Sequence, residues 1–134
     1  MMALSIRQPW AWMILNGGKR VENRGWPTYF RGRFLIHASK TPAAPDECDA
    51  AIHMLNASHP DPASLIVPYV RDMQCGGIVG EAELSACVTV APRGQEHWFT
   101  GPFGFVLVNV RRVPFRPYRG QVGFFNVERG RGNS

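Results

Sequence analysis

The segment GGKRVENRGW, residues 17–26, holds a dense group of charged side chains directly after two glycines. These side chains are Lys19, Arg20, Glu22 and Arg24. In an extended chain Glu22 and Arg24 point to the same side, and Lys19 joins them only if the chain still turns at the glycines. Glu22 would then orient both cations and leave donors free for a phosphate or a base edge. The alternative is a solvated ion-pair cluster on an exposed turn, and the spacing alone does not decide between the two.

Other side chains that suit a ligand flank the expected start of a helix at Pro9. These are Ser5, Gln8 and Trp10. A helix start offers backbone N–H groups to an anion, and a glutamine can hydrogen-bond to a base edge. The alternative is that Ser5 and Gln8 only cap the helix while Trp10 packs in the core.

Further candidates lie on a loop and on the following strand. Trp26 and Trp98 both border loops, where an aromatic ring could stack on a base, although such rings more often belong to the core. Arg33 and His37 share one face of a predicted strand, and we include both among the ligand-binding residues. A structural histidine, hydrogen-bonded within the protein, is the alternative for His37.

The net charge of +5 is unevenly distributed along the chain. Residues 1–40 carry seven basic and one acidic residue, residues 41–110 carry two and eight, and residues 111–134 carry six and one. If the fold brings the basic ends together, they form a face that attracts phosphates. The residues that we expect to contact a nucleic-acid backbone are Arg7, Arg112, Arg116 and Arg119. Basic surface that only keeps the protein soluble is the alternative.

Composition narrows the class of protein further. No run approaches the ~20 apolar residues of a membrane span, and no signal peptide is visible. The three widely spaced cysteines do not form a disulfide framework and suit a reducing cytoplasm. No metal-ligand spacing is present, so we expect no metal and no cofactor. We also expect a monomer.

Short elements joined by turns predict a small α+β domain over residues 1–128, followed by a flexible basic tail over 129–134. The expected strands cover residues 3–6, 31–39, 78–90 with a bend near Gly80, 103–113 and 120–127, and the helices cover 10–15 and 46–57. We expect Asp46 to cap the second helix and the strand 103–113 to be central and buried on both faces. Five or six strands with two or more flanking helices favour a closed or half-closed β-barrel, which protects strand edges.

Several segments together resemble the ASCH domain, the module named after a homology region in a human transcriptional coactivator. They are LSIRQPWAWMIL, GGKRVENRGW, RGRFLIHAS, GGIVGEAELSACV and PFGFVLVNV. The resemblance runs over roughly residues 3–128 and is greatest in Gly-x-Lys-x-x-Glu-x-Arg. The leading Ser-x-x-Gln-Pro-Trp is typical of the coactivator-like branch. The resemblance implies a β-barrel like that of PUA RNA-binding domains, with a cleft beside the first helix that the motif lines.

The resemblance also implies two kinds of function. Members of the family bind nucleic acid, whereas a bacterial branch hydrolyses acetylcytidine and another relative has ribonuclease activity. Lys19 matches the lysine of the amidohydrolase branch, but Glu22 stands where that branch has threonine. We expect Glu22 to keep Lys19 protonated, which makes Lys19 a ligand for phosphate or carbonyl groups rather than a general base. Glu81 and Glu83 match the catalytic glutamate of that branch by residue type alone.

We therefore expect a nucleic-acid-binding module, for RNA more than DNA, that holds a single-stranded or extruded nucleotide in the cleft around Lys19, Glu22 and Arg24. The first alternative is a metal-independent hydrolase of an acylated nucleoside or of RNA, with Lys19 and Glu22 as its catalytic residues. The second is a protein-interaction adaptor, which an exposed SLIVPYV segment (residues 64–70) would favour.

Overall fold

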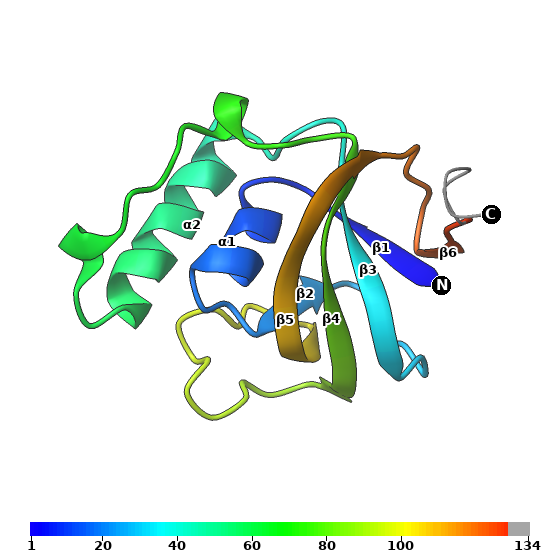
Figure 1. The fold of residues 1–134 in the computed structure, drawn as a ribbon. Coiled ribbons are helices and arrows are strands. Elements are labelled where there is room, and N and C mark those ends of the chain that lie inside the picture. Colours follow the sequence, from blue (N-terminus) through cyan, green and yellow to red (C-terminus); the bar gives the residue numbers. More distant parts are fainter. Residues whose placement is uncertain (129–134) are drawn as a thin grey trace.

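The computed structural model describes residues 1–128, which form one curved sheet with two α-helices beside it (Figure 1). The strands are β1 (Met2–Ile6), β2 (Val21–Arg24), β3 (Gly32–Ala38), β4 (Gly77–Val88), β5 (Phe103–Pro117) and β6 (Phe124–Asn126). The helices are α1 (Trp10–Asn16), α2 (Pro45–Ser58) and two 3₁₀ turns, Pro62–Ser64 and Val70–Asp72. The predicted tail over 129–134 lies outside the described residues.

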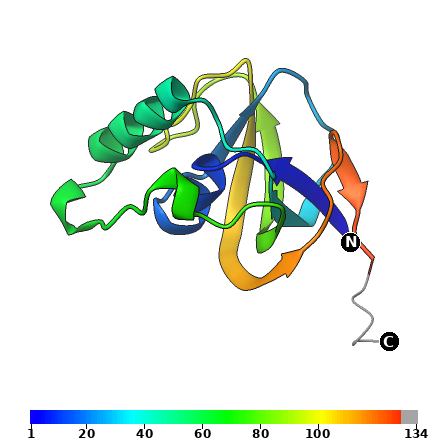
Figure 2. The same ribbon diagram turned by 90° about the horizontal axis from the view of Figure 1, so that it is seen from above.

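The six strands follow the order β2-β5-β4-β3-β1-β6. Strands β1 and β3 are parallel, and the other neighbours are antiparallel. The sheet curls into a half-barrel, and both helices lie on the same side of the molecule (Figures 1 and 2). This architecture confirms the predicted α+β class and the PUA-like barrel of about six strands.

The main core fills the space between the curled sheet and α1. Leu4, Phe34, Ile36 and Phe105 are fully buried there, together with Ile14 from the helix. Alternation in the predicted strand 31–39 correctly placed Phe34, Ile36 and Ala38 in the core. A second cluster, centred on Met13, Leu55 and Trp98, joins α1 to α2 and to the loop that precedes β5.

Two local predictions were wrong. Asp46 does not cap α2, because the helix begins at Pro45 after Ala44, and no side chain caps it. A proline suits this first position because its missing N–H has no helical partner there. Strand β5 is not buried along its length, since residues after Leu107 are exposed or half-buried. It continues past the four residues that pair with β2, so its second half has β4 as its only strand neighbour among the described residues.

Side chains join the two edges of the sheet that the backbone leaves open. Strands β2 and β6 are the outermost strands and do not pair with each other. Arg24 of β2 donates from Nη2 to the carbonyl oxygen of Ser5 in β1 at 2.7 Å. Beyond it, Trp26 packs edge-on against Phe124 of β6, with ring centroids 6.2 Å apart. The motif segment therefore lies along the seam of the half-barrel.

In residues 1–128, no helix is both long and apolar enough to cross a membrane.

Candidate functional site

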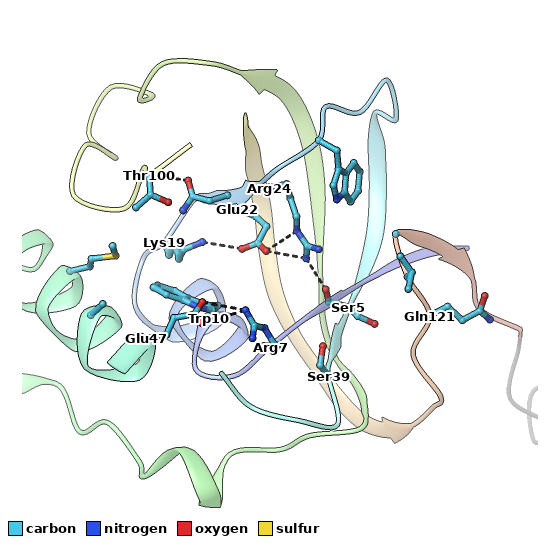
Figure 3. Close-up of a pocket in the computed structure, with 16 residues that line it drawn as sticks. Ser5, Arg7, Trp10, Lys19, Glu22, Arg24, Ser39, Glu47, Thr100 and Gln121 are labelled. Atoms are coloured by element: carbon cyan, nitrogen blue, oxygen red, sulfur yellow. Dashed lines mark hydrogen bonds and ion pairs between the residues drawn. The ribbon is translucent and has the colours of Figure 1, made fainter. Parts of the chain in front are cut away.

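A cleft of about 640 Å³ opens at this seam (Figure 3). Its walls come from β1, β2, the first turn of α1, one face of α2 and the segment before β6. The volume lies within the range of ~300–1,000 Å³ that is common for small-molecule sites. The motif residues Lys19, Glu22 and Arg24 all line this first cleft.

Lys19 reaches the cleft because the chain reverses at Gly18. Gly18 has φ of +81°, which suits glycine, and the Lys19 N–H then donates to Met13 O at the end of α1. The lysine side chain is only 1% exposed. Its ammonium donates to the carbonyl oxygen of Val21 and to Glu22 Oε1, the latter at 3.1 Å. The turn expected at the two glycines thus brings Lys19 to the same side as Glu22.

Glu22 is shared between two cations. Lys19 contacts its Oε1, whereas Arg24 Nε donates to its Oε2 at 3.1 Å. Arg24 also bonds to Ser5 O, so a continuous chain of polar contacts crosses the seam (Figure 3). Within the described residues Arg24 Nη1 makes no protein hydrogen bond, and it remains available to a ligand.

Burial lowers the pKa of Lys19. Loss of hydration lowers the pKa of Lys19 below its ordinary value of 10.5, and the charge of Glu22 opposes this effect without reversing it. Arg24 adds a smaller lowering of the same pKa because it is also positive. Glu22 therefore acts on the pKa of Lys19 in the expected direction, but burial has the larger influence.

Two tryptophans stand beside the cations. The Lys19 ammonium lies 5.4 Å from the ring centre of Trp10, and the Arg24 guanidinium lies 5.9 Å from that of Trp26. Both rings line the cleft, and Trp26 is 37% exposed. Trp98, by contrast, is 1% exposed and belongs to the core, so it does not offer a stacking surface.

Sequence reasoning missed a second carboxylate in the cleft. Glu47 of α2 accepts a hydrogen bond from Trp10 Nε1 at 2.8 Å and forms an ion pair with Arg7 at 3.3 Å. In the sequence Glu47 is one of several acidic residues at the start of a helix, and nothing there indicates that it faces the motif.

Asn23 was also missed, although it lies in the motif. Its side chain donates to Trp98 O and accepts from Thr100 N, which holds the loop before β5 against β2.

Two predicted ligand residues have protein partners. Gln8 is 3% exposed and does not line the cleft; its Oε1 accepts from Trp12 N, and its Nε2 donates to Gln74 O. His37 is 1% exposed and bonds through Nδ1 to Ser5 Oγ at 2.9 Å and through Nε2 to Tyr118 O at 2.7 Å. Gln8 thus caps α1, whereas Ser5 lines the cleft while supporting His37.

The remaining predicted residues are divided between the cleft and other surfaces. Arg7 lines the first cleft, and Arg119 lines a second cleft beside it. Arg33, Arg112 and Arg116 line neither of these clefts. Arg7 comes from the first basic segment of the sequence and Arg119 from the last. Both line the second cleft, so the two basic segments come together there.

The two glutamates matched by residue type also lie elsewhere. Glu81 is buried and pairs with Arg111 and, at 3.9 Å, with Arg33. Glu83 accepts a hydrogen bond from Asn109. Neither residue lines either cleft. No group of three His, Cys, Asp or Glu within residues 1–128 is arranged to hold a metal ion.

Comparison with known protein families identifies the domain over most of the chain. A family model described as the ASCH domain matches residues 4–119, and the chain belongs to the ASCH domain family. It is 34% identical over 86 residues to activating signal cointegrator 1 of Homo sapiens, and the same holds for that of Mus musculus. Each alignment covers 64% of this chain but 14% of the relative, so the similarity concerns a small part of those proteins.

Proposed function

We propose that this ASCH domain binds single-stranded nucleic acid, with RNA preferred over DNA, and holds one nucleotide in the first cleft. The observation that carries the proposal is the set of polar contacts that joins Lys19, Glu22 and Arg24 at the wall of the cleft. The rings of Trp10 and Trp26 line the same cleft. Membership of the ASCH family supports interaction with nucleic acid.

The chemistry of the cleft suits a base better than a bare phosphate. Glu47 and Glu22 bring acceptors into the cleft, and Arg24 and Arg7 bring donors, so both kinds of polar edge on a base can be matched. Trp26 is exposed enough to offer part of its ring to a base, a contact that tolerates any sequence. A single strand can extrude a base into such a cleft at a smaller cost than a duplex.

Fluorescence anisotropy with a labelled single-stranded RNA of about ten nucleotides tests this proposal. We expect saturable binding that weakens as salt rises, because phosphate contacts release counterions. The variant Arg24→Gln should lower affinity by about tenfold, since it removes a charged donor. Arg33→Gln makes the same change at an exposed position outside the clefts and is the matched control. Equal affinities of the two variants, or no binding by the wild type, would refute the proposed site.

A hydrolase is the second candidate, and the buried state of Lys19 favours it. A lysine whose pKa is lowered can exchange a proton more readily than an exposed lysine. In this alternative, Glu22 takes a proton from a water that attacks the acyl carbon of an acylated nucleoside or the phosphorus of RNA, while Lys19 stabilises the developing negative charge. The C–N bond or a P–O bond then breaks, and the departing amine or oxygen receives a proton from Lys19, which Glu22 reprotonates. Acetylcytidine and labelled RNA, incubated with wild type and Lys19→Met, distinguish the cases. Turnover that Lys19→Met abolishes supports the hydrolase, and turnover that it leaves unchanged removes Lys19 from the mechanism.

The adaptor alternative depends on the segment between α2 and β4. Ile66 is 90% exposed and Tyr69 is 70% exposed, whereas Leu65 and Val67 pack beneath them on the second core cluster. If this segment were the functional surface, Ile66→Ser would abolish partner capture and leave RNA binding intact.

We also propose a cytoplasmic location and a monomeric state. Sedimentation analysis tests the monomeric state.

A further inference from the structure

A second cleft, of about 790 Å³, adjoins the first. The two share five lining residues, which form the partition between them: Ser5, Arg7, Ser39, Gln121 and Val122. In Figure 3 Gln121 lies beside β6, Arg7 lies beside Glu47, and Ser5 and Ser39 lie between them. Val122 is fully exposed on this partition. A chain-like ligand can therefore extend from one cleft into the other.

The two clefts differ in charge. The first is lined by three cationic side chains and by the carboxylates of Glu22 and Glu47. The second has three cationic side chains, Arg7, Lys40 and Arg119, and among residues 1–128 no Asp or Glu lines it. Because a phosphodiester carries a full negative charge, the carboxylates make the first cleft the less favourable place for it. The electrostatic difference assigns the base to the first cleft and its phosphate to the second.

The wall of the second cleft is held in place by buried hydrogen bonds. His37 donates from Nε2 to the carbonyl oxygen of Tyr118, and its Nδ1 bonds to Ser5 Oγ. Gly120 packs directly on this pair, because a Cβ there would lie 2.7 Å from both His37 Cε1 and Ser5 Oγ. The segment that carries Arg119 and Gln121 is thereby fixed against β1 and β3, which limits the entropy lost when it binds a ligand.

We propose that the second cleft is a phosphodiester subsite, in which Lys40 and Arg119 bind the phosphate that follows the nucleotide held in the first cleft. This inference rests on the proposed function and specifies it, because it makes an oligonucleotide rather than a free nucleoside the ligand. Arg7 lies on the partition and can reach either side once it leaves Glu47, a partly exposed pair that contributes little stability.

The test compares two forms of one single-stranded RNA trinucleotide, with natural phosphodiester linkages or with uncharged methylphosphonate linkages. Each is titrated by calorimetry into wild type, into Lys40→Gln/Arg119→Gln and into a control, Arg31→Gln/Arg71→Gln. The control removes two exposed arginines that line neither cleft. We expect neutral linkages to weaken binding to wild type and control by about tenfold or more. In the second-cleft variant the loss should be about twofold, because little phosphate recognition remains.

The outcomes separate this inference from the proposal on which it rests. If all three proteins lose the same affinity with neutral linkages, while Arg24→Gln still weakens both probes, the phosphodiester subsite is wrong and the nucleotide cleft stands. If neither probe binds wild type at millimolar concentration, the proposed function is refuted and this inference with it. The subsite is supported if neutral linkages cost less affinity in Lys40→Gln/Arg119→Gln than in both wild type and the control variant.

Discussion

Lys19 Nζ lies 3.1 Å from Glu22 Oε1, and Arg24 Nη2 lies 3.0 Å from the other oxygen of the same carboxylate. One buried carboxylate therefore pairs with two cations from the same short segment. The side chains of Lys19 and Glu22 are 1% and 10% exposed, so water contributes little to their solvation. The cluster is thus part of the folded structure as well as part of a ligand site.

The central position of Glu22 predicts an order of stabilities. Glu22→Gln leaves two cations close together without an anion, and we expect it to lower the free energy of unfolding by about 3 kcal/mol. Lys19→Met should cost less, because Glu22 keeps Arg24 as a partner and methionine fills much of the space. Urea unfolding at pH 7 measures both values. A larger loss in Lys19→Met would contradict the shared-anion arrangement.

The lowered pKa of Lys19 predicts a pH dependence of stability. The unfolded chain, with the ordinary pKa of 10.5, binds more protons than the folded protein between the lowered pKa and 10.5. Stability of the wild type relative to Lys19→Met should therefore rise with pH through this window and level off above it. Urea unfolding at a series of pH values measures this difference, and Lys40→Met is the control for loss of an exposed lysine. A difference that falls as pH rises would contradict the assigned direction.

Glu47 predicts a gain in affinity on substitution. Its carboxylate lies in the first cleft and holds Arg7, so Glu47→Gln removes a repulsive charge and frees a cation. We expect RNA binding to tighten about two- to fivefold, which corresponds to about 0.5–1 kcal/mol. Asp49→Asn removes a charge from the same helix at an exposed position outside the clefts and should have a smaller effect. Glutamine keeps an acceptor oxygen for a base, so weaker RNA binding by Glu47→Gln, measured by anisotropy, would contradict the expectation that the charge of Glu47 opposes binding.

Gly120 predicts a local packing requirement. An alanine side chain at this position must displace the buried His37 ring or Ser5, both of which have hydrogen-bond partners, so Gly120→Ala should cost about 1–3 kcal/mol. Gly25→Ala is the matched control, since a Cβ there meets nothing within 4 Å and its φ is not in the left-handed region. Thermal unfolding of the two variants checks this, and equal midpoints would mean that the segment can shift without strain.

Much of the fold could be predicted because its signals are local. Alternation placed Phe34 and Ile36 in the core, and Pro9 followed by an apolar run correctly marked α1. The exposure of the second half of β5 could not be predicted this way. It depends on β2 being only four residues long and pairing with β5 only up to Val106, which is a property of the sheet rather than of β5 itself.

The site was only partly predictable for a related reason. Lys19, Glu22 and Arg24 are close in sequence, and a turn at the two glycines was named as the condition under which Lys19 joins the other two. The structure has that turn at Gly18. Glu47 and Gln121 come from distant segments and meet the motif only through the packing of α2 and the path of the chain before β6. The burial of Gln8 and His37 likewise depends on partners 66 and 81 residues away.

The four tryptophans allow the most direct test of the central claim, that the first cleft holds a nucleotide. Trp10 and Trp26 line that cleft, whereas Trp12 and the buried Trp98 do not. Single-stranded RNA is titrated into the full chain and followed in ¹H–¹⁵N spectra. The indole signals of Trp10 and Trp26 should shift, and the shifts should saturate with the dissociation constant found by anisotropy. The indole signals of Trp12 and Trp98 should not shift. Saturable RNA binding that leaves Trp10 and Trp26 unmoved would contradict the account.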